Sequence, residues 1–261
     1  MQTEEIRKSL NQACGDSPTL RKILLQLMNW MTLKTWHIRR ELRKWMRSSP
    51  EKAHILDLGT GFGHNAYWLS CQKERFSILA IDDKQERIVK GNAFVRDTQC
   101  KNLLFRTKDL PCFKENEAFD LILCTDTLEH IKEDQQTLEN MHASLRDEGM
   151  MITTASLKYG EESEIEGEFH RMGYSMEGLK SHFKNAGFRK VKGHYTGGKA
   201  GKLSHLIGIG IPMKLLKFSR LFMLLLPFYF FLAIPIVILL NWLDSQTAHL
   251  NGEGLLILAW K

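Results

Sequence analysis

Residues 54–65 decide the fold of this chain, and they read HILDLGTGFGHN. The first part is mostly apolar, as a buried strand requires, and it carries Asp57. Alternate positions of the second part are glycine, namely Gly59, Gly61 and Gly63. Glycine lets a backbone turn with positive φ and approach a ligand without a Cβ in the way. An amphipathic segment, 66–72, follows directly, so the stretch predicts the strand, glycine loop and helix of a nucleotide-type cofactor cradle.

Three further strand candidates follow this loop, and each leads to a polar residue. They are residues 77–81 before Asp82, residues 102–107 before Asp109 and Leu110, and residues 119–124 before Thr125. Asp82 lies twenty-one residues beyond Gly61, and an acid at that distance, at the tip of the next strand, suits the two hydroxyls of a ribose. The G-x-G-x-G spacing differs from the dinucleotide fingerprint G-x-G-x-x-G.

Together these motifs resemble those of the class I S-adenosylmethionine-dependent methyltransferases. That family combines an acidic-x-G-x-G-x-G loop with an acid after each of strands two and three, and with a fourth strand that leads into Leu-Glu-His. This chain shows DLGTGFG, then Asp82, then Asp109, then FDLILCTDTLEHI, in that order. The resemblance covers roughly residues 50–196. It implies an α/β Rossmann-like fold with a seven-stranded, mostly parallel sheet whose seventh strand is antiparallel.

The resemblance also implies S-adenosyl-L-methionine as cofactor and assigns its contacts. Asp57 would help to hold the methionine amino group, and the three glycines would pass under the methionine and ribose. Asp82 would take the two ribose hydroxyls. Asp109, with Leu110, would lie beside the adenine, and Thr125 would face the methionine moiety. No metal ion is expected in this site.

Two histidines are candidates for a catalytic base, which an acceptor hydroxyl group would require. His130 lies in the sequence LEHI, and His170 lies in EFHRMGY. A histidine whose pKa is near neutrality suits this role, although His130 has the alternative role of a hydrogen-bond partner at a helix start. Arg171 and Tyr174 would bind the acceptor in the same region. Residues 161–168 are expected to form a solvated acidic loop.

Length and composition fit one α/β domain with additions. The chain has 261 residues, and strand-like and helix-like patterns alternate along its middle. Helices are predicted over residues 84–97, 132–145 and 175–186, and the later strands over residues 150–154, 188–194 and 255–259. Five scattered cysteines without a C-x-x-C pair indicate free thiols in a reducing compartment and no zinc site. The first twelve residues lack the apolar core of a signal peptide.

An N-terminal extension, residues 1–49, is rich in cations and tryptophan. Residues 16–18 read DSP, which is a helix start signal, and apolar residues then recur at helical spacing. Residues 34–47 carry six Lys or Arg side chains against one acid, Glu41, with tryptophans among them. One reading is a solvated basic helix that covers the sheet edge. The other is an interfacial helix, with tryptophan at the depth of lipid headgroups and arginine on anionic lipid.

The most unusual segment, residues 221–243, is an uncharged run of twenty-three residues, LFMLLLPFYFFLAIPIVILLNWL. A run of this length is a membrane candidate, and Pro227 and Pro235 are expected to break or kink it. The expected organisation is therefore an N-terminal extension over residues 1–49, a methyltransferase domain over residues 50–200 and 252–261, and a hydrophobic membrane-associating helical insertion over residues 201–251.

The seventh strand constrains how that insertion meets a membrane. If residues 255–259 form this strand, the chain must return to the side that it left, so a single crossing does not fit. A kinked hairpin, re-entrant or in the membrane plane, is favoured. The alternatives are a single span, which Lys214, Lys217 and Arg220 would orient by the positive-inside rule, and a soluble lid or an apolar dimer interface.

The sequence therefore predicts a membrane-associated methyltransferase on the cytoplasmic face of a membrane, with a hydrophobic or lipid-linked acceptor. Two alternatives stay open: a membrane-docked protein that binds cofactor or partner without methyl transfer, and a methyltransferase for a soluble small molecule. A net charge of +6 suits an anionic lipid surface. Because no nucleic-acid-binding module is recognisable, no nucleic-acid partner is expected.

Overall fold

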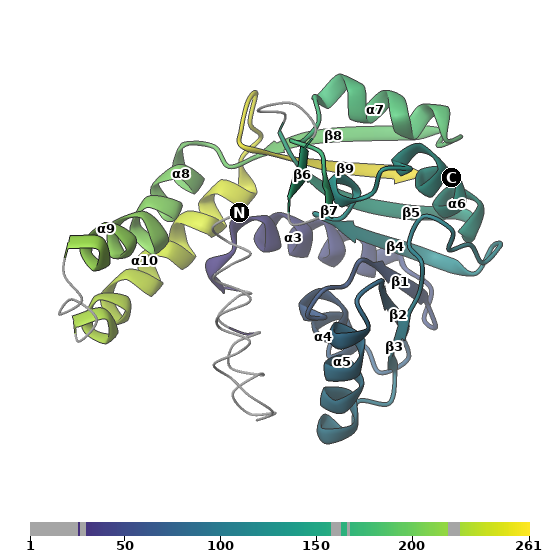
Figure 1. The fold of residues 1–261 in the computed structure, drawn as a ribbon, viewed down its shortest axis with the longest axis horizontal. Helices are drawn as coiled ribbons and strands as arrows, with labels where there is room; N and C mark the ends of the chain where they lie inside the picture. The colour runs from purple at the N-terminus through teal and green to yellow at the C-terminus, as the bar shows by residue number, and fades with distance from the viewer. Residues whose placement is uncertain (1–25, 27–29, 158–162, 166–167, 219–224) are drawn as a thin grey trace. The chain divides into compact units, whose positions relative to one another are not determined.

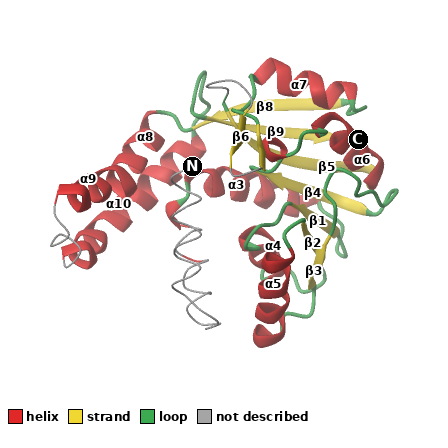
Figure 2. Cartoon of the chain, in the orientation of Figure 1, coloured by secondary structure: helices red, strands yellow, loops and turns green. Residues whose placement is uncertain are grey.

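The computed structural model describes residues 26, 30–157, 163–165, 168–218 and 225–261. The chain forms two compact units. One is a helical unit of residues 1–39 and 197–247, and the other is a sheet unit of residues 40–196 and 248–261. Figure 1 labels the elements, and Figure 2 separates helices from strands.

A seven-stranded sheet forms the centre of the sheet unit. Its strands are β1 His54–Leu58, β2 Ser77–Asp82, β3 Leu103–Thr107, β4 Phe119–Thr125, β5 Leu145–Ser156, β8 Lys190–Thr196 and β9 Gly254–Trp260. Their order is β3-β2-β1-β4-β5-β9-β8. The first five pair in parallel, whereas β9 is antiparallel to both β5 and β8. The α/β fold expected from the sequence, with its antiparallel seventh strand, is thereby confirmed, and this strand, β9, lies between β5 and β8.

The strands form where the sequence is apolar without interruption, because a parallel strand is buried on both faces. Ile55, Leu56 and Leu58 of β1 are fully buried, as are Leu121 and Ile122 of β4. The helices of this unit are α4 His64–Ser70, α5 Gln85–Thr98, the 3₁₀ turn η1 Leu128–His130, α6 Asp134–Ser144 and α7 Met176–Asn185. These bounds agree with the predicted helices to within about two residues at most ends.

One expectation in this unit is corrected. Residues 161–168 were expected to form a loop, but the described residues form two short antiparallel strands, β6 Ser163–Ile165 and β7 Glu168–His170. Residues 161–162 and 166–167 lie outside the described residues. Hydrogen bonds between main-chain groups hold the two strands of this hairpin together, whatever the charge of the side chains. The number of acidic residues in the segment therefore does not predict whether it forms strands.

Helix α3, Leu33–Ser48, contains the cation-rich segment. Its second half packs on the sheet unit, where the rings of Trp45 and Phe76 are 5.8 Å apart and the guanidinium of Arg43 lies 5.9 Å from the Trp68 ring centre. The Lys73 ammonium donates to the Met46 carbonyl at 3.0 Å. This half of the helix therefore covers protein, as in the first of the two readings. The predicted helix start at 16–18 lies outside the described residues.

The helical unit is built around a helical hairpin. Its outgoing arm consists of α8 Lys199–His205, the π-helical turn η2 Leu206–Gly210 and α9 Ile211–Phe218, and its return arm is α10 Leu226–Gln246. The arms are antiparallel, because Gly201 pairs with Asp244 and Tyr229 pairs with Ile207. Pro227 lies in the first turn of α10, where no N–H is needed. The helix continues through Pro235, so residues 226–243 of the apolar run form one helix and not two.

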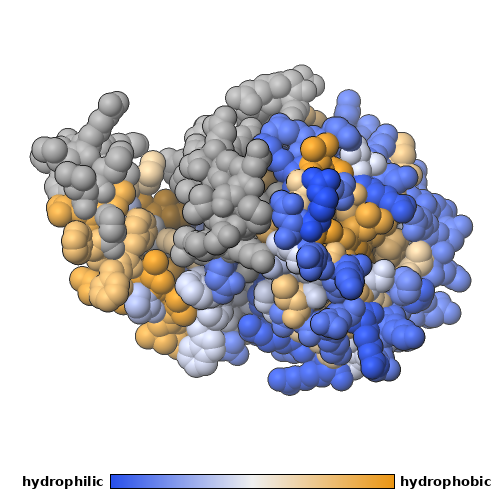
Figure 3. Space-filling view, turned by 90° about the horizontal axis from the view of Figure 1, so that it is seen from below, coloured by the Kyte–Doolittle hydropathy of each residue, from blue (hydrophilic) through white to orange (hydrophobic). Residues whose placement is uncertain are grey.

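Among the described residues, one helix is long and apolar enough to cross a membrane, namely α10 over Phe228–Gln246. Buried core helices of soluble proteins pass the same test of length and composition. Only 28% of the apolar window in α10 is buried. Figure 3 shows the apolar side chains of the described surface in orange.

Candidate active site

The glycine loop leaves β1 at the carboxyl edge of the parallel strands, where open α/β sheets bind ligands. Backbone hydrogen bonds fix its course, with the Thr60 amide donating to the Ile81 carbonyl at 2.9 Å and the Gly63 amide donating to the Thr60 carbonyl at 2.9 Å. The Gly61 amide donates to the Asp82 carboxylate at 2.8 Å. The loop after β1 is therefore tied to the end of β2.

The three glycines all have positive φ, but they serve different purposes. A Cβ on Gly59 would lie 2.3 Å from Thr127, and one on Gly63 would lie 2.5 Å from the Phe105 ring, so both positions are closed by packing. A Cβ on Gly61, where φ is +56°, would meet no atom within 4 Å. The loop therefore presents a bare backbone with open space beside its central glycine, as a ligand cradle requires.

Two carboxylates are held beside this loop, and each is only 1% exposed. Asp57 accepts a hydrogen bond from the Thr60 hydroxyl at 2.7 Å. Asp82 accepts from the amides of Gly61 and Lys84, at 2.8 and 3.0 Å. Burial of an ionised carboxylate is costly unless such donors compensate it. The structure thus brings Asp57, the glycines and Asp82 together, as the sequence led us to expect.

Arg87, in the first turn of α5, adds a contact that sequence reasoning missed. One guanidinium nitrogen lies 3.4 Å from each carboxylate oxygen of Asp82. The guanidinium also lies 5.9 Å from the ring centre of Phe62, which belongs to the glycine loop. Arg87 therefore touches both loops of the cradle. The sequence gives no local sign of this contact, because it depends on how the end of β2 meets the start of α5.

The exit of β3 lies beside the same acid. The amide of Lys108 donates to the Asp82 carbonyl at 3.1 Å, which places the segment with Asp109 next to the end of β2. Asp109 is exposed, whereas Leu110 is 6% exposed and belongs to the hydrophobic core. A hydrogen bond to the Asp109 carboxylate raises the pKa of the Cys112 thiol.

The end of β4 completes the edge of the site. The Thr125 hydroxyl accepts a hydrogen bond from the side-chain amide of Asn65 at 3.3 Å. Asn65, in the first turn of α4, is 1% exposed, and its carbonyl oxygen has no hydrogen-bond partner among the described residues. A buried amide oxygen in this state suits an incoming donor. Sequence reasoning missed Asn65, although it directly follows the glycine loop.

A second polar cluster lies at the entrance to α6 and is already satisfied by protein partners. Tyr174 donates to the Asp134 carboxylate at 2.8 Å, and Arg171 makes an ion pair with the same carboxylate. Arg171 also donates to the Tyr174 hydroxyl at 2.8 Å. Burial and the Asp134 charge raise the pKa of Tyr174. These contacts anchor the segment after β7, and they occupy the two side chains that were expected to bind the acceptor.

The two candidate bases come from adjoining segments. His130 is exposed at the end of η1, and its amide donates to the Thr127 carbonyl at 2.9 Å. His170 ends β7, and its side chain lies outside what the structure describes. The amide of Arg171, the next residue, donates to the Glu129 carbonyl at 2.7 Å. The structure thus brings the backbones of both segments together near the carboxyl end of β4.

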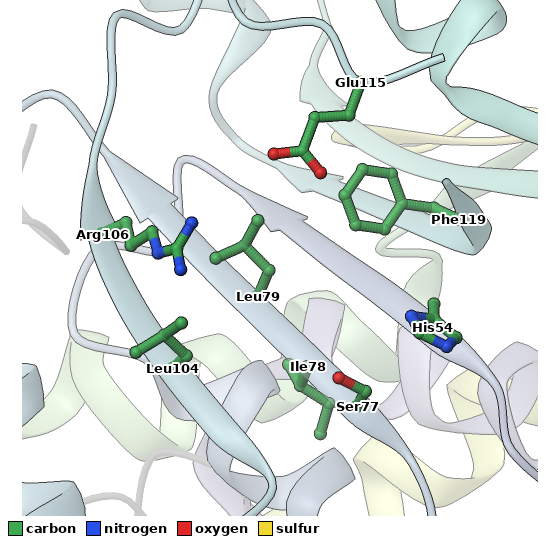
Figure 4. A pocket seen from close by; sticks show the side chains of 8 residues that line it. All are labelled: His54, Ser77, Ile78, Leu79, Leu104, Arg106, Glu115 and Phe119. Atoms are coloured by element: carbon green, nitrogen blue, oxygen red, sulfur yellow. The ribbon is translucent and has the colours of Figure 1, made fainter. Parts of the chain in front are cut away.

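A pocket of about 180 Å³ lies elsewhere on the sheet unit. Figure 4 shows its lining, which includes His54, Ser77 and Phe119 from the amino ends of β1, β2 and β4. Ligands of open α/β sheets bind at the opposite, carboxyl ends of the strands. The pocket is therefore separate from the glycine cradle.

A family model described as a methyltransferase domain matches residues 49–208. The match covers more than half of the chain, and the chain belongs to this methyltransferase family. Ubiquinone biosynthesis O-methyltransferase of Rickettsia canadensis is 29% identical over 101 residues, which are 39% of this chain and 42% of that protein. The same enzyme of Rickettsia conorii is 27% identical over 107 residues, 41% of this chain and 36% of that protein. The match thus spans about two fifths of these relatives.

Solved structures share the fold. A putative sarcosine dimethylglycine methyltransferase from Galdieria sulphuraria superposes with a TM-score of 0.59 at 16% identity, covering 93% of this chain and 88% of that chain. Phosphoethanolamine N-methyltransferase 2 of Haemonchus contortus, solved with S-adenosyl-L-methionine, gives a TM-score of 0.56 at 15% identity. The superposition covers 85% of this chain and 52% of that chain. At these identities the likeness concerns the fold alone.

Proposed function

We propose that this protein is an S-adenosylmethionine-dependent methyltransferase that works at the cytoplasmic face of a membrane on a hydrophobic or lipid-linked acceptor. The observation that carries the proposal is the cradle itself: a bare Gly61 backbone beside open space, with the buried carboxylates of Asp57 and Asp82 next to it. Family membership supports the methyltransferase part of this proposal.

The residues of the cradle fit this cofactor. Asp82 offers two acceptor oxygens to a ribose diol, and charge-assisted hydrogen bonds of this kind are stronger than neutral ones. Asp57 and the Asn65 carbonyl offer acceptors to the methionine ammonium group. The glycines let the backbone run beneath the ligand. The exposed carboxylate of Asp109, just after β3, would accept a hydrogen bond from the adenine amine. The next residue, Leu110, is buried in the core.

A bound S-adenosylmethionine supplies a methyl group on a sulfonium sulfur, which is already strongly electrophilic. The protein's task is then mostly alignment of the acceptor with that methyl group and exclusion of water. Thr125 and Asn65, which are hydrogen-bonded to each other at 3.3 Å, would hold the methionine end at β4. Where the acceptor is a hydroxyl group, the imidazole of His170 or His130 would take its proton, and the bound cofactor would supply the methyl group.

Two observations favour an apolar acceptor at a membrane. Helix α10 exposes large apolar side chains, among them Phe231 at 79% and Leu232 at 69%. The curated relatives are named for ubiquinone biosynthesis, and they are O-methyltransferases. Both observations favour an acceptor that partitions into lipid.

Calorimetry tests the cofactor assignment. Purified protein should bind S-adenosylmethionine with a Kd of about 1 μM, or roughly −8 kcal/mol. Asp82→Ala should weaken this binding by about 1.5–3 kcal/mol per lost charge-assisted bond, whereas Asp97→Ala, on the exposed part of α5, should not. Equal affinity for a nicotinamide dinucleotide would refute the assignment.

A second experiment tests methyl transfer and the acceptor class. Protein, S-adenosylmethionine carrying a labelled methyl group and a membrane lipid extract are incubated, and the products are separated into organic and aqueous phases. Label in an organic-phase product is expected. Label only in a water-soluble product identifies the soluble-acceptor alternative, and cofactor binding without any labelled product identifies the binding-protein alternative. Substitution of His170 and of His130 by Gln then tests which imidazole acts as base.

A further inference from the structure

Helix α10 has its polarity reversed relative to a helix of a soluble protein. Phe228, Phe231 and Ile236 are exposed at 73, 79 and 49%, and Leu239 and Trp242 at 54 and 48%. Soluble helices turn this kind of residue toward the core. Several large apolar side chains exposed along one helix are rare on monomeric soluble proteins, and such a patch marks an interaction site.

The opposite face of α10 is polar and buried. Asn241 and Asp244 are fully buried, and Ser245 is 1% exposed. Asn241 accepts from the Ser204 hydroxyl at 2.7 Å and donates to the Trp30 carbonyl at 3.1 Å. Asp244 accepts from the Gly201 amide at 2.9 Å, and it lies 3.0 Å from Nε2 of the buried His37. Hydrogen bonds thus hold the hairpin together, and its apolar side chains face outward.

Positive charges lie at both ends of the outgoing arm. Lys199 and Lys202 are exposed on α8, and Lys214 is exposed on α9. Only eleven residues separate Lys202 from Lys214. As a helix they would extend about 16 Å, well short of the roughly 30 Å of a hydrocarbon core. The outgoing arm is therefore too short between its charges to cross a bilayer.

The ends of the hairpin also lie together. Tyr195 at its start and His249 at its end form a β-bridge within the sheet unit, and Thr196 pairs with Gly254. A chain that crossed once through α10 would end on the far side. Because both ends are joined in one sheet, α10 does not cross alone.

We propose that the hairpin lies in the plane of the membrane, with the apolar face of α10 in the acyl region of one anionic leaflet. The lysines at the two ends of the outgoing arm rest on the headgroups, and cationic side chains of this kind are attracted to anionic lipid. Trp30 and Trp242, both about half exposed in this unit, lie at the headgroup boundary, where tryptophan is enriched. The proposal rests on the membrane part of the proposed function and specifies its geometry.

Vesicle co-sedimentation of the full chain tests the surface. Binding to mixed phosphatidylcholine and phosphatidylglycerol vesicles is expected, and Phe231→Glu with Leu239→Glu should weaken it at least tenfold. Val89→Glu is the matched control, because Val89 is 57% exposed on α5 in the sheet unit, and it should bind as the wild type does. Lys199→Gln with Lys202→Gln should weaken binding to the anionic vesicles and leave binding to pure phosphatidylcholine unchanged.

Two further readouts decide the geometry. Trp242 fluorescence should be quenched more by lipid brominated near the headgroup than near the chain end, with Trp242→Phe as the blank. In the Lys214→Cys variant, the new thiol should react with a membrane-impermeant thiol reagent added outside the vesicles. Peptide mass analysis locates the label, because Cys71 and Cys112 are also exposed. Protection of that Cys, stronger quenching by the deep bromines, or equal vesicle binding by the Phe231→Glu, Leu239→Glu variant would overturn the proposal.

The outcomes separate this inference from the cofactor assignment. The Phe231→Glu, Leu239→Glu variant should keep the wild-type affinity for S-adenosylmethionine in calorimetry. If the wild type binds cofactor but not vesicles, the in-plane surface is refuted and the methyltransferase assignment stands. If the double variant instead converts a dimer into a monomer without changing vesicle binding, the face is an interface between two copies, and the proposal is again refuted.

Discussion

The carboxylate of Asp82 accepts a hydrogen bond from the backbone amide of Gly61, at 2.8 Å. The acid at the end of β2 therefore holds the loop after β1 in shape. Removing this acceptor takes a hydrogen bond from each of the half-buried amides of Gly61 and Lys84, at about 0.5–1.5 kcal/mol for each bond lost. Asp82→Ala should accordingly lower the free energy of unfolding as well as cofactor affinity. Urea denaturation measures this, and an unchanged unfolding midpoint would show that the loop stands without Asp82.

A comparison of two alanine substitutions separates packing from ligand approach. Gly61→Ala adds a Cβ that meets no protein atom, so its cost to stability is the strain of a left-handed alanine, about 1–2 kcal/mol. Gly59→Ala drives a Cβ to 2.3 Å from Thr127 and should cost more, because buried packing must move. Thermal unfolding ranks the two, and calorimetry on Gly61→Ala should show lost cofactor binding in a folded protein. Wild-type affinity in that variant would place the ligand elsewhere.

The helical unit should depend on Asp244. This carboxylate is the acceptor for the Gly201 amide and for the ring of His37, all of them buried. Asp244→Ala leaves two donors without it, at about 1–3 kcal/mol each. Asp244→Asn keeps one acceptor oxygen and should therefore lower the stability of the helical unit less. Asp147→Ala, at an exposed position of the sheet unit, should leave that stability unchanged. Limited proteolysis of the hairpin ranks the variants, and equal resistance of all four proteins would contradict the expectation.

The stability of the sheet unit should fall in mild acid because of His142. Burial, and the charges of Lys261 and Arg189, lower the pKa of His142 below its ordinary 6.5. The unfolded chain then binds a proton at a pH where the folded chain does not. The stability that neutral His142 contributes is therefore fully present above about pH 6.5. This contribution is lost as the pH falls toward the lowered pKa of the folded state.

His142→Gln should reduce the difference between urea midpoints measured at about pH 7.5 and about pH 5.5. His205→Gln, exposed in the helical unit, should retain the full wild-type difference. A variant His142→Gln with the same acid sensitivity as wild type would assign that sensitivity to other groups.

The parts of the site that could be predicted from the sequence are those built from local signals. A strand that runs into alternate glycines fixes the loop, and an acid at the next strand end fixes Asp82, because both features depend on a few consecutive residues. Thr127 beneath Gly59 could not be predicted, since the contact joins residues 68 apart and depends on β4 lying beside β1. Asn65 and Arg87 are similar, because their roles appear only when neighbouring loops meet.

The insertion also has features that could be predicted from the sequence and features that could not. Its apolar run and its return to the sheet could be predicted, since hydropathy and the antiparallel strand both appear in the sequence. The partners of Asn241 and Asp244 could not, because a polar residue near the end of an apolar run carries no sign of which helix will face it. The hairpin of β6 and β7 was missed because acidic side chains in that segment suggest solvent, while main-chain pairing decides its structure.

The position of β9 has a consequence for the order of events during synthesis. This strand fills the place between β5 and β8, yet the ribosome makes it after the whole of α10. Until β9 is made, β8 has no neighbour in the sheet, although the whole of the apolar helix α10 has already been synthesised. If the hairpin docks on lipid as we propose, a chain made next to a bilayer would dock before its sheet closes. Lipid near the ribosome should then raise the yield of folded protein rather than only its activity.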